Sequence, residues 1–261
     1  MNLELQNRVV LITGGAAGIG EATVRAFAAE GAIVWFADRN ADRGRALAAE
    51  VPRSVFAEGD LADPMFCAEL ISSVLREAGR LDVLVNNAGV NDSVSLSGSP
   101  TDFMASLRRN LLHVFALAHH AQEALCQSRG CILNLSSKVA ETGQGGTSGY
   151  AAAKGAVNAL TREWAVALAP HGVRVNAVIP AECDTDQYQR WFASQPDPQA
   201  ARETIERMVP FGRRLTSPAE IAATLVFLAS PRAGHITGQW IHVDGGYTHL
   251  DRAMTGGHPG W

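Results

Sequence analysis

The chain has 261 residues, a net charge of −4 and no basic runs, which argues against a nucleic-acid-binding surface. No apolar stretch approaches the roughly 18 residues needed to span a bilayer. Residues 1–6 lack the basic and apolar regions of a signal peptide. We therefore expect a cytoplasmic protein that binds neither nucleic acid nor membrane.

The four cysteines of the chain are consistent with a cytoplasmic protein. Four cysteines show no metal-type spacing: Cys67, Cys126, Cys131 and Cys183. The default for such residues is a set of reduced and mostly buried thiols. The sequence predicts neither a disulfide nor a zinc site.

The first predicted elements are a strand, a glycine-rich turn and a helix. Residues 8–13 form a short apolar run with β-branched side chains, and residues 21–30 favour a helix. Between them lie Gly14, Gly18 and Gly20, whose spacing departs from the usual Gly-x-Gly-x-x-Gly fingerprint. Glycines at such a turn let the backbone approach a pyrophosphate, and the helix N-terminus adds unpaired N–H groups and a partial positive charge. The segment is typical of a dinucleotide-binding turn.

The second strand, residues 32–37, ends at Asp38, eighteen residues after Gly20. An acidic residue near this position binds the adenosine ribose in dinucleotide-binding folds. A carboxylate accepts hydrogen bonds from the ribose hydroxyls of NAD but repels the extra phosphate of NADP. Asp38 therefore favours NAD, whereas Arg39 leaves NADP possible because an arginine there could pair with a phosphate.

Apolar strands then alternate with helical stretches along the rest of the chain. The predicted strands are residues 54–58, 82–86, 130–135, 173–179 and 239–243. This alternation indicates βαβ units, a parallel sheet with helices on both faces, and a ligand at the carboxyl ends of the strands. Doubly wound α/β units of this length are common, so residues 1–261 are expected to form one domain.

Four polar positions point to catalysis. Tyr150 and Lys154 lie four residues apart in a predicted helix, residues 148–169, so both side chains share one helix face. A tyrosine titrates near about 10, and a neighbouring cation lowers that pKa, which makes a usable general base. Ser137 lies thirteen residues before Tyr150, and Asn110 lies within a helical stretch where its propensity is poor.

Several motifs together resemble the short-chain dehydrogenase/reductase family over nearly the whole chain. The motifs are Thr13-Gly14-x3-Gly18-x-Gly20, Asn86-Asn-Ala-Gly89, Asn110, Ser137 and Tyr150-x3-Lys154. The resemblance implies an extended Rossmann fold with a doubly wound seven-stranded parallel sheet. It also implies a nicotinamide cofactor, oxidation or reduction at a carbonyl or alcohol carbon, and a homotetramer.

The family's residue roles follow from the same motifs. They assign proton transfer to Tyr150, pKa lowering and ribose binding to Lys154, substrate orientation to Ser137, and a water relay to Asn110. The resemblance implies cofactor contacts with Gly14, Gly18, Ile19, Gly20, Asp38, Asp60, Leu61, Asn87, Ala88, Gly89, Tyr150, Lys154 and Pro180. Asp60 could instead be an ordinary helix cap, and residues 87–89 an ordinary turn.

The region between residues 180 and 218 is expected to be irregular and to form a lid over the substrate, with Tyr188 and Trp191 as aromatic anchors. Within it, the chain has Pro180-Ala181-Glu182 where most family members carry Pro-Gly. That replacement puts a carboxylate near the nicotinamide pocket, where it could bind a sugar hydroxyl or only change the loop conformation.

Finer stretches resemble the bacterial L-fucose dehydrogenase branch, namely residues 89–92, 136–145, 161–168, 178–182 and 245–252. Such enzymes oxidise the anomeric hydroxyl of L-fucose, L-galactose or D-arabinose to an aldonolactone. The expected substrate contacts are Asn91, Asp92, Ser137, Lys138, Gln144, Tyr150, Glu182, Tyr188 and Trp191. Glu141 and His249 are further candidates for the polar pocket wall, which suits a sugar better than a steroid.

Two alternatives stay open. The first is an NAD-dependent dehydrogenase of another secondary alcohol, such as a polyol, hydroxysteroid or 3-hydroxyacyl thioester, because one scaffold serves many substrates. The second is a regulator that binds the nucleotide without turnover, which the intact Asn110, Ser137, Tyr150 and Lys154 disfavour.

Overall fold

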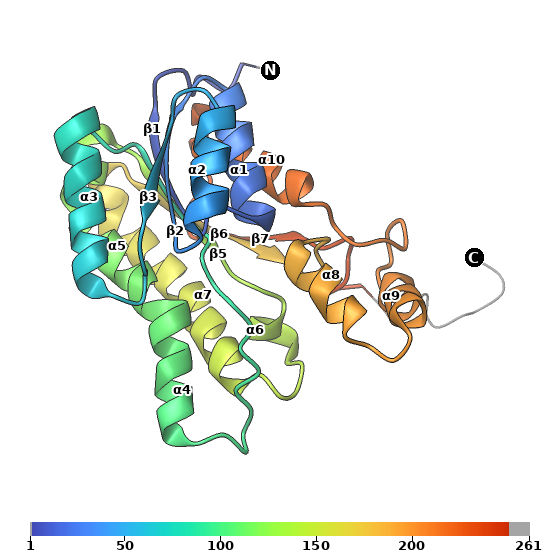
Figure 1. Cartoon of the computed structure of the whole chain (residues 1–261). Helices are drawn as coiled ribbons and strands as arrows, with labels where there is room; N and C mark the ends of the chain where they lie inside the picture. The colour runs from blue at the N-terminus through green and yellow to red at the C-terminus, as the bar shows by residue number, and fades with distance from the viewer. Residues whose placement is uncertain (1, 251–261) are drawn as a thin grey trace.

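A computed structural model, which describes residues 2–250, has one seven-stranded parallel sheet at its centre (Figure 1). Each strand begins and ends within one residue of the sequence prediction. The strands are β1 (Val9–Thr13), β2 (Ile33–Asp38), β3 (Ser54–Glu58), β4 (Val83–Asn86), β5 (Cys131–Leu135), β6 (Arg174–Pro180) and β7 (Trp240–Val243). The predicted fold class is confirmed.

The strand order is β3-β2-β1-β4-β5-β6-β7, and every pairing is parallel. The chain builds outward from β1 to β3, then crosses back to place β4 on the other side of β1. Such a reversal of strand order leaves a crevice at the carboxyl ends of the two central strands. The residues that follow β1 and β4 are the glycine-rich turn and Asn87, so the predicted cofactor motifs meet at this point.

Helices cover both faces of the sheet. One layer contains α1 (Gly18–Ala29), α2 (Ala41–Glu50) and α10 (Pro218–Ala229), and the other contains α3 (Pro64–Ala78), α5 (His113–Ser128) and α7 (Ser148–Leu168). Consecutive residues of β1 alternate between the two cores, because Val10 and Ile12 pack with the first layer and Val9 and Leu11 with the second. Burial on both faces explains why the strand reads as a continuous apolar run.

The region from residue 180 to residue 218 is more ordered than the sequence suggested. It contains two helices, α8 (Asp186–Ala193) and α9 (Pro198–Arg207), which lie beyond the carboxyl ends of the strands and appear in orange in Figure 1. The side chains of Thr185 and Asp197 cap their N-termini by accepting hydrogen bonds from backbone N–H groups. The prediction of an irregular loop was wrong. Three prolines in the region suggested loops, and the two helices are too short to show a clear helical pattern in the sequence.

The remaining elements are short. They are α4 (Pro100–Leu107), the π-helical turn η1 (Arg108–Leu112), α6 (Val139–Thr142) and two 3-10 turns at Ala169–His171 and Pro231–Ala233. Among the helices described between residues 2 and 250, none is long and apolar enough to cross a membrane. Residues 251–261, which include the end of the family-like stretch 245–252, lie outside the described residues.

At the amino-terminal edge of the sheet, Asp82 ties together the starts of β1 and β4. Its carboxylate accepts hydrogen bonds from Val9 N (2.9 Å), Arg80 Nε (2.8 Å) and Arg8 Nη1 (2.8 Å). Burial pushes the pKa of the Asp82 carboxyl upward, but the hydrogen bonds from Arg80, Val9 and Arg8 outweigh it and hold the pKa below its usual range. The charged form is therefore the one that stabilises the fold.

Asp82→Ala should lower the free energy of unfolding by about 2 kcal/mol at neutral pH, because the buried N–H of Val9 loses its acceptor. The stabilisation should be complete above the ordinary aspartate pKa of about 3.9 and disappear as acid protonates the carboxyl. Urea denaturation at several pH values measures both effects. Arg80→Gln is the matched control and should cost no more than about 1 kcal/mol, because that side chain is 49% exposed. Equal losses in the two variants would contradict this assignment.

Candidate active site

A cavity of about 870 Å³ opens at the carboxyl ends of the central strands. Most of the residues predicted to contact cofactor or substrate line it. They are Gly14, Gly18, Ile19, Gly20, Asp38, Asp60, Leu61, Asn87, Ala88, Gly89, Asn91, Ser137, Lys138, Gln144, Tyr150, Lys154, Pro180, Glu182, Tyr188 and Trp191. Two predicted residues are outside this lining. Asn110 is buried behind it, and Asp92 binds Ser106 and Arg109.

The glycine-rich turn at one end of the cavity is closely packed. Gly14 and Gly18 have φ angles of +64° and +56°, the left-handed region that side chains with a Cβ rarely adopt. A Cβ on Gly20 would lie 1.9 Å from the carbonyl oxygen of Gly14, so only glycine fits there. Helix α1 begins at Gly18 without a side-chain cap, so first-turn N–H groups remain available to an anionic ligand.

Thr13 joins this turn to the segment after β4. Its hydroxyl accepts hydrogen bonds from the backbone N–H groups of Asn87 (2.9 Å) and Ala88 (3.0 Å). The Asn87 side chain donates in return to the carbonyl oxygens of Thr13 (2.8 Å) and Gly14 (3.1 Å). These hydrogen bonds hold the two loops together at the base of the cavity. Asn87 therefore stabilises the fold and also lines the cavity.

Two acidic residues line the cavity after β2 and β3. Asp38 accepts hydrogen bonds from the backbone N–H groups of Ala16 (3.2 Å) and Asn40 (2.9 Å), which orient its carboxylate at the end of β2. Asp60 accepts from Ala62 N (2.9 Å). The alternative role of Asp60 as a helix cap is not seen, because the Asp63 side chain caps α3 instead.

Ser137, Tyr150 and Lys154 come together around the ends of β5 and the start of α7. Tyr150 is hydrogen-bonded to Ser137, and the Lys154 ammonium lies 5.6 Å from the centre of the Tyr150 ring. The same ammonium donates to the carbonyl oxygen of Leu135 at 2.6 Å. Ser136, the neighbouring rival to Ser137, turns the other way and donates to the Lys154 carbonyl oxygen at 3.2 Å. The thirteen-residue interval therefore selects the serine that faces the tyrosine.

The pKa values of this pair differ from the sequence expectation. Burial raises the pKa of Tyr150 to about 12, against the smaller lowering effect of the Ser137 hydrogen bond. Burial lowers the pKa of Lys154 to about 8. The expected lowering of the Tyr150 pKa by Lys154 is thus wrong for the protein alone, because desolvation dominates both groups.

Asn110 lies in the π-helical turn η1 rather than in a regular helix. Its side-chain oxygen accepts from Val90 N (2.7 Å) and its amide nitrogen donates to Ser106 O (3.1 Å). A π turn interrupts the i→i−4 hydrogen bonds, and such turns occur frequently at functional sites. The poor helix propensity of asparagine was the sequence signal for this turn. One turn later, buried His113 contacts Ala88 O at 3.2 Å, and burial lowers the pKa of its imidazole to about 4.

Glu182 occupies the centre of a buried polar group on the substrate side. Its carboxylate accepts hydrogen bonds from Lys138 Nζ and from the Tyr188 hydroxyl. Glu182 is only 5% exposed, and all three side chains line the cavity. Lys138 also lies 4.0 Å from the ring centre of Tyr247. Three of the predicted substrate contacts therefore form one hydrogen-bonded cluster.

Asp92 does not join this cluster. Its carboxylate accepts from Arg109 Nη2 (2.6 Å) and Ser106 Oγ (2.9 Å), so it binds the α4–η1 region instead of facing the cavity. That Asp92 contacts substrate stays a prediction, since its partner Arg109 lines the cavity. Glu141 and His249 are also outside the cavity lining, and His249 Nε2 lies 3.9 Å from Glu141 Oε2.

Sequence reasoning missed several residues of the wall. Thr185, Ile205, Met208 and Tyr247 line the cavity from α8, α9 and the segment after β7. The sequence held one usable signal, the threonine N-cap before Asp186, which marks the start of α8. Tyr247 lies 56 residues after Trp191 and 65 after Glu182, and the sequence signal for it was the family-like stretch of residues 245–252.

The cavity fits the nicotinamide dinucleotide that the sequence resemblance implied. The uncapped N-terminus of α1 and the left-handed glycines suit a pyrophosphate. Asp38 suits an adenosine ribose, and the Lys154 ammonium suits the second ribose beside Tyr150. A Cβ on Gly89 would lie 3.2 Å from Lys154 Nζ, so glycine leaves the space beside that ammonium open.

Known proteins resemble this chain over nearly its full length. A family model described as enoyl-(acyl carrier protein) reductase matches residues 14–248. The L-fucose dehydrogenase of Mus musculus is 41% identical over 241 residues, which cover 92% of this chain and 88% of that one. Among solved structures, the Cj0485 dehydrogenase has a TM-score of 0.93 and 41% identity, over 97% of this chain and 98% of that one. The ligand-free aldohexose dehydrogenase of Thermoplasma acidophilum has a TM-score of 0.88 and 30% identity, over 96% and 98% of the two chains.

The matched stretch runs from the glycine turn to the segment after β7, so it includes every element that builds the cavity. The likeness extends to the whole sheet and to both helix layers. The chain therefore belongs to the short-chain dehydrogenase/reductase family of nicotinamide-dependent oxidoreductases.

Proposed function

We propose that the protein oxidises the anomeric hydroxyl of L-fucose, or of the related sugars L-galactose and D-arabinose, to an aldonolactone. The observation that carries this proposal is the buried cluster of Glu182, Lys138 and Tyr188 in the cavity wall, beside Ser137 and Tyr150. A sugar needs several hydrogen bonds in its pocket, whereas a steroid pocket is mostly apolar. The similarity to the mouse enzyme supports the same substrate class.

In the proposed reaction, Tyr150 accepts the proton of the anomeric hydroxyl as the C–H bond at the same carbon breaks. A bound oxidised nicotinamide would supply the acceptor for the hydride that leaves this carbon. Ser137 donates a hydrogen bond that orients the reacting oxygen, and Lys154 binds the nicotinamide ribose. The positive charge of the oxidised cofactor would favour the phenolate and so oppose the effect of burial on the Tyr150 pKa.

Proton transfer away from Tyr150 needs a path to solvent. Lys154 is buried, and its ammonium contacts the Leu135 carbonyl oxygen. A Cβ on Gly89 would lie 3.2 Å from Lys154 Nζ and 3.4 Å from Asn110 Oδ1, so these two groups flank one small space. We assign to Asn110 the role of holding a water there, which links the lysine to solvent.

NAD is the cofactor we propose. Asp38 holds a carboxylate at the end of β2, in the cavity lining, where an extra phosphate on the ribose would be repelled. Arg39 also lines the cavity and is exposed, so it leaves some use of NADP open.

We also propose a cytoplasmic homotetramer in which α8 and α9 form the substrate lid. Large apolar side chains on the outer faces of α5 and α7 support the assembly, since Phe115 and Val166 are more than half exposed. Tyr188 and Trp191 on α8 and Met208 after α9 line the cavity, which supports the lid. All four cysteines are free, in keeping with a reducing compartment.

The substrate class is tested with a panel of sugars, polyols and hydroxysteroids, each with NAD and with NADP. L-fucose, L-galactose or D-arabinose should show the highest kcat/KM, and NAD should be preferred, because Asp38 repels the extra phosphate. Absorbance of the reduced nicotinamide follows the reaction. A polyol or a hydroxysteroid that outranks every sugar would overturn the proposed substrate.

Tyr150→Phe should lower kcat by about 10³-fold, because the general base is lost while the aromatic ring is kept. Steady-state kinetics measure the loss, and titration with NAD should show unchanged cofactor affinity. In the unsubstituted enzyme, kcat/KM for oxidation should rise with pH through the neutral range, because burial keeps Tyr150 in its phenol form. A variant within tenfold of the parent activity would exclude Tyr150 as the base.

Glu182→Gln should raise the KM for the sugar about tenfold or more, because a hydrogen bond to a charged group is worth about 1.5–3 kcal/mol. The KM for NAD should stay nearly constant. Asp184→Asn is the matched control on the same loop, since Asp184 is outside the cavity lining, and it should leave both constants unchanged. An equal rise of both KM values in Glu182→Gln would assign Glu182 to loop conformation instead of sugar binding.

A further inference from the structure

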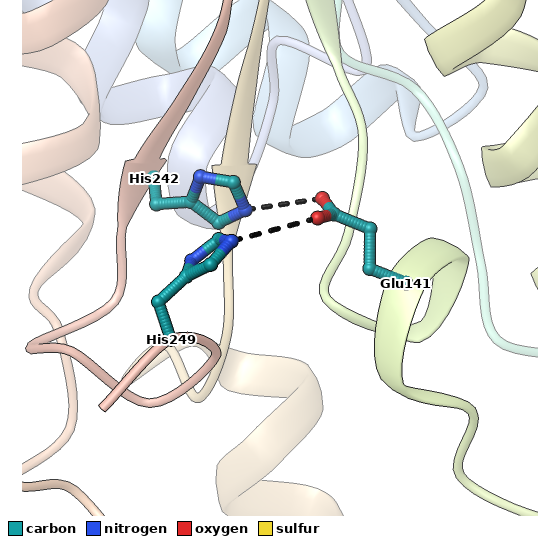
Figure 2. A group of neighbouring side chains, drawn as sticks. All are labelled: Glu141, His242 and His249. Carbon is teal, nitrogen blue, oxygen red and sulfur yellow. Dashed lines mark hydrogen bonds and ion pairs between the residues drawn. The ribbon is translucent and has the colours of Figure 1, made fainter. Parts of the chain in front are cut away.

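Three metal-binding side chains converge outside the cavity, at the end of β7. His242 Nε2 lies 3.0 Å from Glu141 Oε1, and His249 Nε2 lies 3.9 Å from Glu141 Oε2. Figure 2 shows both imidazole rings directing a nitrogen toward the same carboxylate. The two rings meet edge to face, with their centres 4.3 Å apart. The ligand atoms of all three residues lie within 4.8 Å of one another.

The three residues come from separate elements. Glu141 belongs to α6, His242 to β7, and His249 to the segment that follows β7. Within residues 2–250, this is the one cluster of three histidine, cysteine or acidic side chains that could hold a metal ion. Glu141 and His249 were expected in the sugar pocket, and cysteine spacing predicted no metal, so the sequence pointed away from this arrangement.

The donor set and its spacing suit a divalent ion of the zinc class. Zinc binds imidazole nitrogen and carboxylate oxygen at about 2.0–2.2 Å in tetrahedral geometry, which places neighbouring donors about 3.4 Å apart. The observed separations of 3.0 and 3.9 Å, each from a histidine nitrogen to a different oxygen of Glu141, lie on either side of that value. Two histidines and one glutamate leave the fourth position to water. The Glu141 and His242 side chains are about four-fifths buried, while His249 is 61% exposed, so an ion can enter from solvent.

We propose that Glu141, His242 and His249 form a zinc-binding site that fastens the segment after β7 onto α6. That segment is already shaped by Asp244, whose carboxylate accepts from Gly246 N and Thr248 N at 2.8 Å each. Tyr247 lies within it, in the cavity lining and 4.0 Å from Lys138 Nζ. A bound ion holds the two sides of this contact together, because Lys138 immediately precedes α6. The bound ion thereby supports the substrate wall from behind.

The site is tested on the full-length protein without an affinity tag, stripped with a chelator and titrated with zinc against a chromophoric competitor. The protein should bind one zinc per chain, and Glu141→Gln and His249→Ala should each weaken binding by more than about tenfold. Cobalt should give the visible absorption of a tetrahedral ion. His119→Ala is the matched control, because His119 and His120 form another close histidine pair, at 4.9 Å between ring centres, and it should bind zinc normally.

No stoichiometric zinc at micromolar concentration would overturn the proposal. So would unchanged affinity in both Glu141→Gln and His249→Ala, because the zinc would then lie elsewhere. Circular dichroism of each variant shows whether it has folded, and a misfolded variant is replaced by His242→Asn. Zinc removal should also raise the KM for the sugar while NAD affinity stays the same. That last readout rests on the proposed function, whereas the zinc stoichiometry tests the site even if no sugar is oxidised.

Discussion

The hydrogen bonds of Thr13 at the junction of β1 and β4 are the interaction on which the rest of the site depends. The order of the parallel strands reverses there, and without a link the two outgoing loops would separate. The Thr13 hydroxyl binds the loop after β4, and Asn87 binds back to the turn after β1. The glycine turn, the Asn87 segment and the space beside Gly89 are therefore positioned as one unit. Every other cavity residue is arranged around this unit.

Burial has opposite effects on the two ends of the cavity. Around Tyr150 and Lys154 it disfavours both charged forms, which raises the pKa of the phenol and lowers that of the ammonium. A positive charge brought by the cofactor then has a large effect on proton transfer, because little solvent screens it. Around Glu182, burial is compensated by Lys138 and Tyr188, which satisfy the carboxylate. Burial thus changes the pKa values at one end, whereas at the other it is matched by hydrogen bonds.

The segments after β6 and β7 complete the site from outside the sheet. Helices α8 and α9 bring Tyr188, Trp191 and Met208 to the cavity, and the segment after β7 brings Tyr247. Neither segment belongs to the doubly wound framework. Proteins of one fold differ in substrate mainly through such added segments. The sheet and its helices are constrained because they position the cofactor and the reacting groups. The proposed zinc site at Glu141, His242 and His249 lies where one of these additions meets α6.

The sequence by itself determined the seven strands, the order of motifs, the glycine turn and the choice of Ser137 over Ser136. These features depend on local patterns: apolar periodicity, glycine spacing and a four-residue interval on one helix face. Only the tertiary structure decided that Asp92 turns toward Arg109, that burial dominates the pKa of Tyr150, and that α8 and α9 replace an irregular loop. The tertiary structure also places His242 beside Glu141, although 101 residues separate them in the sequence. Side-chain direction, desolvation and long-range pairing arise from the packing of distant elements, and no local pattern encodes them.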